Sequence, residues 1–376
     1  MIEQTCWHPV AQAGDLCGAP LAVTLLGQRL VLWRSDDGAA HAWDDRCPHR
    51  GASLSLGCVR SGPDGTQLAC AYHGWRFGTG GQVVSVPAVP GFVPPATHRA
   101  TVYAVAECYG LLWVCLQPDA AEAAGGADAI DAIEATDGLA SIPAFAAEAD
   151  TRLRKVNCGP YWVATSAPRI IENFLDMAHF GFVHEHWLGS REHTAIADYA
   201  VVSTPTGLLA TGCKAWQPRS SVHAEGGADV EYTYEVNAPY TAILTKVPLA
   251  PETPAASPPR GGPGRLGSGP AAVEAGSVAL HDFRESIALF ICPLTPETSQ
   301  VWFRLATCDF ESPDAKLQAF QHTIFIQDQL VLESQRPHRL PISDNAPVRE
   351  LHSAADRSAT AYRRYLRERG ITFGTC

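Results

Sequence analysis

The sequence has no apolar run near the length of a membrane span, although 46% of its 376 residues are hydrophobic. Its first residues, Met1 to Trp7, contain neither a basic segment nor an apolar one, so we expect no export signal and a cytoplasmic location. Positive charge is also scarce. The net charge of −11 disfavours nucleic acid as a partner. These absences indicate a cytoplasmic globular protein that binds neither membrane nor nucleic acid.

The chain also lacks a credible site for a flavin or nicotinamide cofactor. Gly262, Gly264 and Gly267 formally fit G-x-G-x-x-G, but no strand pattern precedes them and no helix pattern follows. They fall in residues 248–276, which are rich in Pro, Gly, Ser and Ala and which we expect to form a long mobile insertion. Electrons from NAD(P)H would therefore reach this chain only through another protein.

Residues 1–118 read as a small all-β unit in which short strand-like runs alternate with Gly, Pro and Asp turns. The runs span residues 21–26, 30–33, 83–86, 101–106 and 111–116. Residues 119–150 are Ala-rich and acidic, which indicates a linker or a loose surface helix. Over residues 151–376, strand-like runs lie between helical segments, which predicts a second, α+β domain with an antiparallel sheet. These runs span residues 199–203, 208–211, 230–236, 242–247, 287–291 and 300–307.

Two turns of the first unit carry cysteine and histidine close together, as Cys47-Pro48-His49 and Cys70-Ala71-Tyr72-His73. Most of the twelve cysteines are expected to be buried thiols, so the clustered ones stand out. One interpretation is a zinc ion held by all four side chains, but zinc sites more often pair Cys with Cys and His with His. The mixed pairs favour a [2Fe–2S] cluster with two thiolates on one iron and two imidazoles on the other.

Residues 170–186 place His179 and His184 among Phe, Leu, Met and Val side chains. A buried imidazole needs a partner, and two structural core histidines are one interpretation. On an unbroken helix, five residues of separation would put the two side chains roughly 140° apart. Gly181 lies between them and can end or distort the helix, which would allow both to bind one metal ion. Imidazole suits iron, zinc or copper.

A third ligand is predicted on a late helix, for which Ser312 is the expected N-cap and Pro313 the first turn. Asp328 lies in the same helical arc as the apolar stripe, whose members are Leu317, Phe320, Ile324, Val331 and Gln335. An acid on a buried stripe is costly unless it is paired or bound to metal. A salt bridge to an arginine is one interpretation, and a 2-His-1-carboxylate iron site is the other.

The composition of residues 354–369 predicts a basic helix with a solvated face or a subunit contact.

Both halves resemble the oxygenase (α) component of Rieske non-heme iron ring-hydroxylating oxygenases. Cys47-Pro48-His49-Arg50-Gly51 and Cys70-Ala71-Tyr72-His73-Gly74-Trp75 are similar to the two halves of a Rieske motif. Asp176-x-x-His179-x4-His184 resembles the catalytic motif, and the segment from Asp328 to Pro337 resembles the region of the third ligand. Ala52 and Ala71 lie near the loops, without the disulfide pair of respiratory Rieske proteins.

The resemblance implies a role for each of these residues. Cluster ligands would be Cys47, His49, Cys70 and His73, and ligands of a mononuclear Fe(II) would be His179, His184 and Asp328. Asp176 would contact His179 and relay electrons from His73 of a neighbouring subunit, although an ordinary local pair is the alternative for this acid. Asn173 matches a polar position near the iron.

The resemblance also implies a β-sandwich Rieske domain followed by a helix-grip catalytic domain, assembled as a head-to-tail homotrimer. A separate reductase or ferredoxin would supply electrons, and the substrates would be O2 and a small aromatic or heterocyclic compound. The pattern is most similar to members that hydroxylate or that remove N- or O-methyl groups. Alternatives are cis-dihydroxylation of an aromatic ring and, without catalysis, a Rieske electron carrier or a ligand-binding module.

Overall fold

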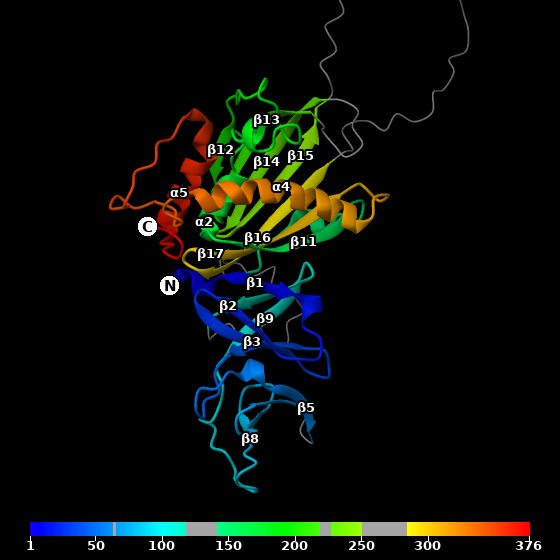
Figure 1. The fold of residues 1–376 in the computed structure, drawn as a ribbon, viewed down its shortest axis with the longest axis vertical. Helices are drawn as coiled ribbons and strands as arrows, with labels where there is room; N and C mark the ends of the chain where they lie inside the picture. Colours follow the sequence, from blue (N-terminus) through cyan, green and yellow to red (C-terminus); the bar gives the residue numbers. More distant parts are fainter. Residues whose placement is uncertain (63–64, 118–140, 219–226, 250–283) are drawn as a thin grey trace, which may run out of the picture.

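The computed structural model describes residues 1–62, 65–117, 141–218, 227–249 and 284–376, which form three antiparallel sheets. The sheets follow one another along the long axis of the molecule (Figure 1). In this part of the chain, no helix is both long and apolar enough to cross a membrane. The predicted insertion from residue 250 onward and the first part of the predicted linker lie outside the described residues.

The middle layer is a six-stranded sheet. In spatial order its strands are β1 (Trp7–Gln12), β10 (Leu111–Cys115), β9 (Val102–Cys108), β4 (Ala40–Asp44), β3 (Gln28–Arg34) and β2 (Leu21–Leu25). Strand β3 is apolar on both faces because both faces are covered. Leu30 and Leu32 belong to a core shared with the C-terminal part of the chain, residues 151–376, whereas Val31 and Trp33 point into a second core on the other side.

That second core is covered by a four-stranded sheet at the far end of the molecule (Figure 1). Its strands are β5 (Cys58–Gly62), β6 (Gly65–Ala69), β7 (Arg76–Phe77) and β8 (Val83–Ser85). Trp33, Trp43 and Phe77 fill this core, and the buried Cys47 and Cys70 belong to it. The two Cys/His turns therefore rest on a rigid apolar base.

The C-terminal part is built on a seven-stranded antiparallel sheet. Its order is β11 (Arg154–Val163), β17 (Thr298–Thr307), β16 (Glu285–Thr295), β15 (Thr241–Pro248), β14 (Ala228–Ala238), β13 (Leu208–Gln217) and β12 (Ala200–Ser203). Helix α4 (Asp314–Ser334) crosses one face, and α5 (Arg357–Arg369) lies beside β12 and β13 (Figure 1). Two shorter helices, α2 (Ala167–Phe174) and α3 (Phe180–Val183), lead to the predicted metal ligands. Single 3-10 turns occur at η1 (Ile2–Thr5), η2 (Ala13–Asp15), η3 (Leu54–Leu56), η4 (Ala146–Ala149) and η6 (Ala354–Asp356).

The N-terminal and C-terminal parts share one hydrophobic core. Phe290 of β16 stacks on Tyr109 at a centroid distance of 5.4 Å and meets the edge of Trp113 at 5.0 Å. The predicted linker contributes here as well, because Ile142 and Phe145 are buried in the same core. Residues 141–150 are thus packed structure rather than a loose segment.

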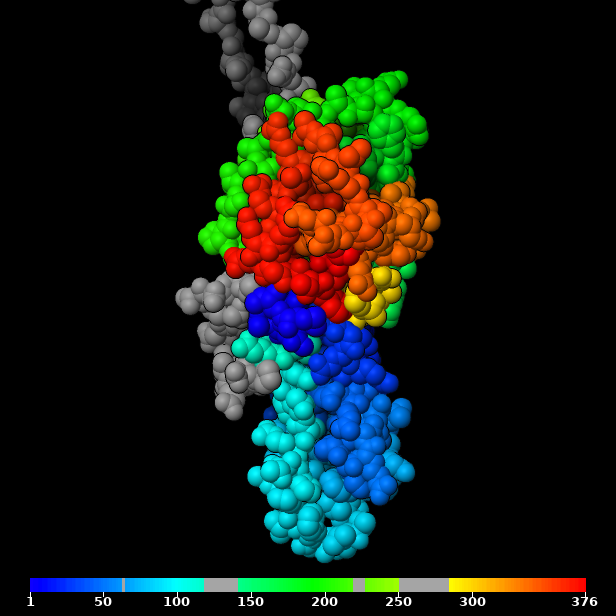
Figure 2. All heavy atoms as spheres, turned by 90° about the vertical axis from the view of Figure 1, so that its left-hand side faces the viewer, coloured from blue at the N-terminus to red at the C-terminus, as the bar shows by residue number. Residues whose placement is uncertain are grey.

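The two ends of the chain also meet. The blue N-terminal residues lie directly against the red C-terminal ones in Figure 2. Glu3 Oε1 accepts hydrogen bonds from the backbone N–H groups of Thr372 and Phe373 at 2.6 and 2.7 Å. Glu3 is fully buried, so these bonds compensate for the loss of hydration of its carboxylate.

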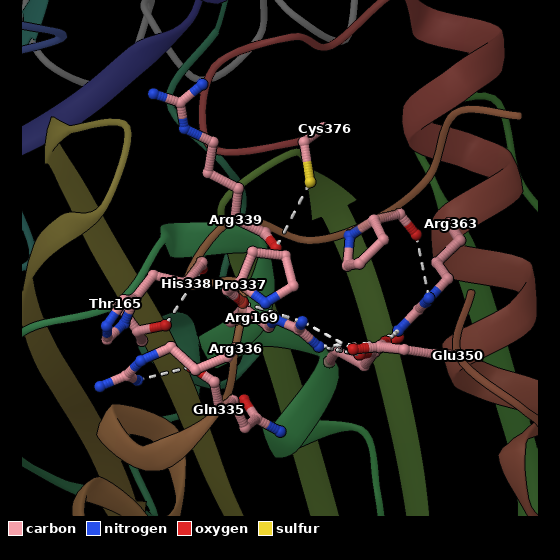
Figure 3. A network of polar contacts seen from close by, with 12 residues as sticks. Thr165, Arg169, Gln335, Arg336, Pro337, His338, Arg339, Glu350, Arg363 and Cys376 are labelled. Atoms are coloured by element: carbon pink, nitrogen blue, oxygen red, sulfur yellow. Dashed lines mark hydrogen bonds and ion pairs between the residues drawn. The ribbon is translucent and has the colours of Figure 1, made fainter. Parts of the chain in front are cut away.

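Helix α2 is held from the side by a buried charge network (Figure 3). Arg169 makes a two-point contact with Glu350, with N–O distances of 3.1 and 2.7 Å, and Arg363 of α5 makes another with Glu172, at 2.5 and 2.8 Å. Arg363 also donates to Glu350. Bidentate arginine–carboxylate pairs fix geometry as well as charge, so the network orients α2 against α5.

Three expectations about helices need correction. The N-cap of α4 is Pro313 rather than Ser312, whose carbonyl instead accepts a bond from Arg154. Val331 lies outside the buried stripe of α4 and is 40% exposed. The basic helix near the C-terminus does not have only a solvated surface, because Arg363 is buried between its acidic partners. Those partners come from distant parts of the sequence, which local charge patterning does not reveal.

Candidate functional site

His179, His184 and Asp328 converge at one point between α3 and α4. One possible ligand atom from each lies within 4.8 Å of the others. The Nε2 atoms of His179 and His184 are 3.4 and 3.1 Å from Asp328 Oδ1. All three side chains are at most 15% exposed. Two imidazoles and one carboxylate facing a common point are the donor set of a facial-triad iron site.

A break between two helices brings the two histidines together. Helix α2 ends at Phe174, and His179 and His184 then flank the single turn of α3 as its N-cap and C-cap. Gly181, which was expected to end or distort the helix, lies inside α3, and the helix breaks after Phe174 and at His184 instead. Its role is close packing: a Cβ there would lie 2.8 Å from the carbonyl oxygen of Ser190.

Each imidazole is oriented through its other nitrogen. His179 Nδ1 is 2.9 Å from Asp176 Oδ2, and His184 Nδ1 is 2.8 Å from Gln327 Oε1. An amide oxygen only accepts, so Nδ1 of His184 donates to Gln327 and Nε2 is left facing Asp328. The carboxylate of Asp176 favours the same tautomer of His179. Both rings are therefore arranged to bind a metal through Nε2.

Gln327 was not found by sequence reasoning. It precedes Asp328, and adjacent residues on a helix point about 100° apart, so the stripe that singled out Asp328 excludes its neighbour. Only the folded position of His184 brings its ring within hydrogen-bonding distance of Gln327. The one available signal was an amide side chain directly before the predicted ligand.

The remaining predicted residues of this centre surround the triad. Asn173 Nδ2 donates to Asp328 Oδ1 at 3.3 Å, and Asp176 Oδ1 accepts from the backbone N–H of Ala178 at 2.8 Å. Among the described residues, Asp328 pairs with the two imidazoles and the Asn173 amide, and with no arginine. The structure thus favours the metal-site interpretation of Asp328 over a structural salt bridge.

These contacts shift the pKa values of His184 and Asp176. Burial lowers the pKa of His184, but the hydrogen bond and charge of Asp328 outweigh it and raise the pKa above the usual value. For Asp176, burial raises the pKa, whereas the hydrogen bond and charge of His179 lower it and dominate. Asp176 is therefore a carboxylate at neutral pH, and its side chain is 31% exposed.

The two Cys/His turns have matching backbone geometry. In the first, Gly51 N–H donates to Cys47 O at 2.8 Å and Cys47 N–H donates to Ala52 O at 2.8 Å. In the second, Gly74 N–H donates to Cys70 O at 3.0 Å and Cys70 N–H donates to Trp75 O at 2.9 Å. Both glycines have left-handed φ angles, +74° and +68°, which explains why glycine ends each motif.

In these two turns the cysteine side chains lie in the core and the histidine side chains lie at the surface. The Cys47 and Cys70 thiols lie side by side in the core, and burial raises the pKa of Cys47 to about 11 against the opposing effect of the His49 and Arg50 N–H groups. The rings of His49 and His73 meet at the surface, with centroids 4.7 Å apart. Two thiols below and two imidazoles above match the asymmetric ligand set of a Rieske [2Fe–2S] cluster.

A cavity of about 90 Å³ lies against the triad and adjoins a larger one of about 740 Å³. The inner cavity is lined by the triad, by Asn173 and by side chains of the sheet and α4. Residues shared by the two cavities are Leu188, Lys246, Ile287, Phe320 and Gln321. The three convergent side chains therefore face a mainly apolar chamber that adjoins the larger cavity, as small-molecule sites commonly do.

Comparison with known proteins agrees with this geometry. Residues 6–103 match the Rieske [2Fe-2S] domain, and residues 163–370 match the vanillate O-demethylase oxygenase C-terminal domain. The chain is 30% identical over 371 residues to the methylxanthine N1-demethylase NdmA of Pseudomonas putida, covering 96% of this chain and 88% of the relative. The structure of Pseudomonas putida CBB5 NdmA with caffeine superposes with a TM-score of 0.73 at 27% identity, covering 98% of this chain and 91% of that one.

A further match concerns a protein of a different kind. A stretch of 113 residues, which is 29% of this chain, is 42% identical to part of the oxidoreductase NdmD of Pseudomonas putida. The match covers 18% of NdmD. The similarity to NdmD is therefore limited to a small part of each protein.

Proposed function

The chain belongs to the Rieske oxygenases whose catalytic half is of the vanillate O-demethylase type, and from this premise we propose that it removes a methyl group from nitrogen or oxygen of a small aromatic or heterocyclic substrate. It is an oxidoreductase that inserts one atom of O2 and carries a [2Fe–2S] cluster and a mononuclear iron. The observation that carries the proposal is the convergence of His179, His184 and Asp328 beside an apolar cavity.

These three side chains are proposed as the ligands of the mononuclear iron, which when bound supplies the means of activating O2. Asp176 and Gln327 hold the two imidazoles so that both Nε2 atoms face the metal position. Asn173 holds one oxygen of Asp328 and limits its rotation. The proposed ligands of the cluster are Cys47 and Cys70 for one iron and His49 and His73 for the other.

The overall reaction consumes one O2, two electrons and two protons. One oxygen atom enters a C–H bond of the methyl group to give a hydroxymethyl group, and the other leaves as water. A hydroxymethyl group on nitrogen or oxygen is unstable, so the C–N or C–O bond breaks, formaldehyde leaves and the N–H or O–H remains. The apolar walls of the cavity orient the methyl carbon toward the metal position and restrict the entry of water.

Electron supply requires contact between copies of the chain. The cluster turns lie at the end of the molecule opposite α2 and α4 in Figure 1, so they are remote from the cavity of the same chain. A head-to-tail homotrimer would instead place His73 of a second copy against Asp176, which is partly exposed and bonded to His179. Asp176 would then connect cluster and iron.

The reducing equivalents are proposed to come from NAD(P)H through a separate reductase or ferredoxin. Similarity to part of the oxidoreductase NdmD supports a partner of this class. We also propose a cytoplasmic location, where such a donor and reduced thiols coexist; all twelve cysteines are free in this structure.

The test is a turnover assay with the reconstituted protein, a ferredoxin and its NADPH-dependent reductase. N-methylated, O-methylated and unmethylated aromatic compounds are supplied in parallel, and O2 consumption and formaldehyde are measured. The proposal expects formaldehyde in equal amount to substrate-dependent O2 uptake with at least one methylated compound. Diol formation from an unmethylated ring would favour cis-dihydroxylation, and absence of any substrate-dependent O2 uptake would contradict oxygenase activity.

A further inference from the structure

Positive charge, scarce in the chain as a whole, gathers at the end of the molecule that carries the two Cys/His turns (Figure 1). Residues 46–99 contain five arginines and a single acidic residue, so all but one of the 39 acidic side chains lie elsewhere in the sequence. The arginines are Arg46, Arg50, Arg60, Arg76 and Arg99, and all five are exposed. Within the described ranges, none of the five forms an ion pair with a carboxylate.

Two acids of the neighbouring sheet reach this end without neutralising it. Asp45 is buried and pairs with Arg29 at 3.1 Å, and Asp36 accepts from the Ser61 hydroxyl at 2.8 Å. A patch of unpaired arginines on a protein with a net charge of −11 is therefore a local positive field, which attracts an acidic partner.

A chain of ring contacts leads away from one of the predicted cluster ligands. The His49 ring lies flat on Trp75, with centroids 4.4 Å apart and planes 5° apart. Trp75 is nearly parallel to His98 at 6.1 Å, and His98 in turn meets Phe92 at 6.4 Å. His73 contacts His49 at the other end of this row. The row therefore connects the cluster turns to a surface away from His73.

Three of the arginines accompany these rings. Arg50 directly follows His49 in the sequence, Arg76 follows Trp75, and Arg99 follows His98.

The far end of the row is apolar and exposed. Residues 86–98 form successive turns, in which the N–H groups of Val89, Phe92 and His98 each donate to the carbonyl three residues before. Val89, Phe92 and Val93 are 55%, 43% and 85% exposed. An apolar patch rimmed by charge is typical of a surface that binds another protein.

We propose that the rings of Trp75, His98 and Phe92, with the arginines beside them, form the docking surface of the electron donor, and that this donor is a small electron carrier with an acidic face. The proposal rests on the proposed function, since it names the surface and the charge of that same partner. A second copy of the chain is proposed to meet His73, so it leaves the His49 end of the row free. Opposite charge guides the carrier to this end, and the apolar patch holds it.

The test measures binding to the metal-loaded protein by isothermal titration calorimetry. The probes are a plant-type [2Fe–2S] ferredoxin, which is acidic, and cytochrome c, a basic carrier. Arg50→Gln/Arg76→Gln removes two charges of the patch. Lys214→Gln/Arg364→Gln is the matched control, because it removes the same charge from exposed positions on β13 and α5.

We expect wild-type protein to bind the ferredoxin more tightly than cytochrome c, with affinity falling as salt screens the charges. Arg50→Gln/Arg76→Gln should weaken ferredoxin binding by about three- to tenfold, and the control pair should leave it unchanged. Equal weakening by both variants would show that net charge alone acts, and this result or tighter binding of cytochrome c would overturn the proposal.

The apolar part of the surface is tested at high salt, where charge contributes little. Phe92→Ser should weaken ferredoxin binding by about tenfold, as loss of a central aromatic contact commonly does. Leu351→Ser is the control, since Leu351 is 90% exposed on a loop of the C-terminal part. Visible absorbance confirms that each variant keeps its cluster. Unchanged binding in Phe92→Ser would contradict this docking position.

Two further measurements separate the alternatives. Sedimentation of the wild type and variants reports assembly size, and a smaller assembly in the arginine pair or Phe92→Ser would assign the surface to a second copy and overturn the proposal. Chemically reduced protein exposed to O2 completes a single turnover without any carrier. Formaldehyde there, with ferredoxin binding that ignores the arginines, would refute the docking surface alone. Arginine-dependent binding without formaldehyde would refute demethylation and leave the docking surface intact.

Discussion

Two different acceptors orient the imidazoles of the proposed iron site. Asp176 is partly exposed and charged, whereas Gln327 is neutral and lies on the helix that also supplies Asp328. An acceptor at Nδ1 fixes the ring and raises the basicity of Nε2, and loss of such partners commonly weakens metal binding by about 10- to 100-fold. Each acceptor can be replaced without touching a ligand.

Gln327→Leu should weaken retention of the mononuclear iron by about tenfold, because His184 loses the partner that holds its ring. Gln327→Glu, which keeps an acceptor, should restore retention. The control is Gln329→Leu on the same helix, since Gln329 bonds to Trp162 O and Glu333 and lies away from the triad. Iron remaining after dialysis against a chelator is measured relative to cluster absorbance. Equal retention in Gln327→Leu and Gln329→Leu would rule out this role.

Asp176→Asn should keep both metal centres and lose turnover. The amide oxygen can still accept from His179, but the negative charge proposed to connect the two centres is gone. Stopped-flow oxidation of the pre-reduced cluster should slow by about 100-fold. Asp198→Asn, a surface acid paired with Arg357, is the control and should have no effect. A near-normal rate in Asp176→Asn would remove the relay assignment.

At the scale of single residues, short motifs predicted most of the candidate site. The spacing of His179 and His184, the two Cys/His turns and the acid on the buried stripe of a helix depend on residue type and local periodicity, which the sequence displays directly. Gln327 could not be predicted because its role depends on how α3 approaches the side of α4.

At the scale of elements, the position of α2 depends on the charge network shown in Figure 3. Burial raises the pKa of Glu350, but hydrogen bonds and charge from Arg169 and Arg363 outweigh it and lower the pKa below 4.5. A carboxyl group with a lowered pKa stabilises the fold above its usual value, and this contribution disappears as the pH falls through the lowered value.

Glu350→Gln should therefore lower the free energy of unfolding by about 2 kcal/mol near pH 7. The difference from wild type should shrink as the pH falls below 4.5, the usual pKa of this group. Glu368→Gln, an exposed acid on α5, should differ little from wild type at either pH. Thermal midpoints measured at pH 7 and at acid pH check this. A difference that stays constant with pH would show that charge is not the cause.

The strand and helix pattern was largely visible in the sequence, and its failures share one cause. Strand β11 was missed because Gly159 and Pro160 interrupt it, yet the strand continues past an irregularity between Cys158 and Tyr161. The last helix was expected to present a solvated face or a subunit contact, because its acidic partners, Glu172 and Glu350, lie elsewhere in the chain. In both cases, tertiary pairing decided what local composition could not.

At the scale of the whole molecule, the shared core fixes the cluster turns at a distance from the cavity (Figure 1). The fold class was predictable, because the family resemblance, now confirmed, carries it. The packing of residues 141–150 into this core was not, since an Ala-rich acidic stretch does not show that Ile142 and Phe145 will be buried. The boundaries at residues 118 and 150 stay predictions.

A mixing experiment tests electron transfer between copies. His49→Ala lacks a cluster ligand and His184→Ala lacks an iron ligand, so each variant alone should be inactive. Coexpressed with different tags, they should recover about a quarter of the wild-type rate, because an intact cluster then meets an intact iron site in some random pairings. A mixed assembly with no recovered activity would contradict transfer between copies.

The central claim is that His179, His184 and Asp328 hold the iron at which O2 reacts. Electron paramagnetic resonance of the reduced, iron-loaded protein exposed to nitric oxide tests it most directly, because nitric oxide binds an open ferrous site and gives a signal distinct from that of the reduced cluster. The account predicts this ferrous–nitrosyl signal in wild type and its loss in Asp328→Ala, with the cluster signal unchanged in both. A full ferrous–nitrosyl signal in Asp328→Ala would contradict the claim.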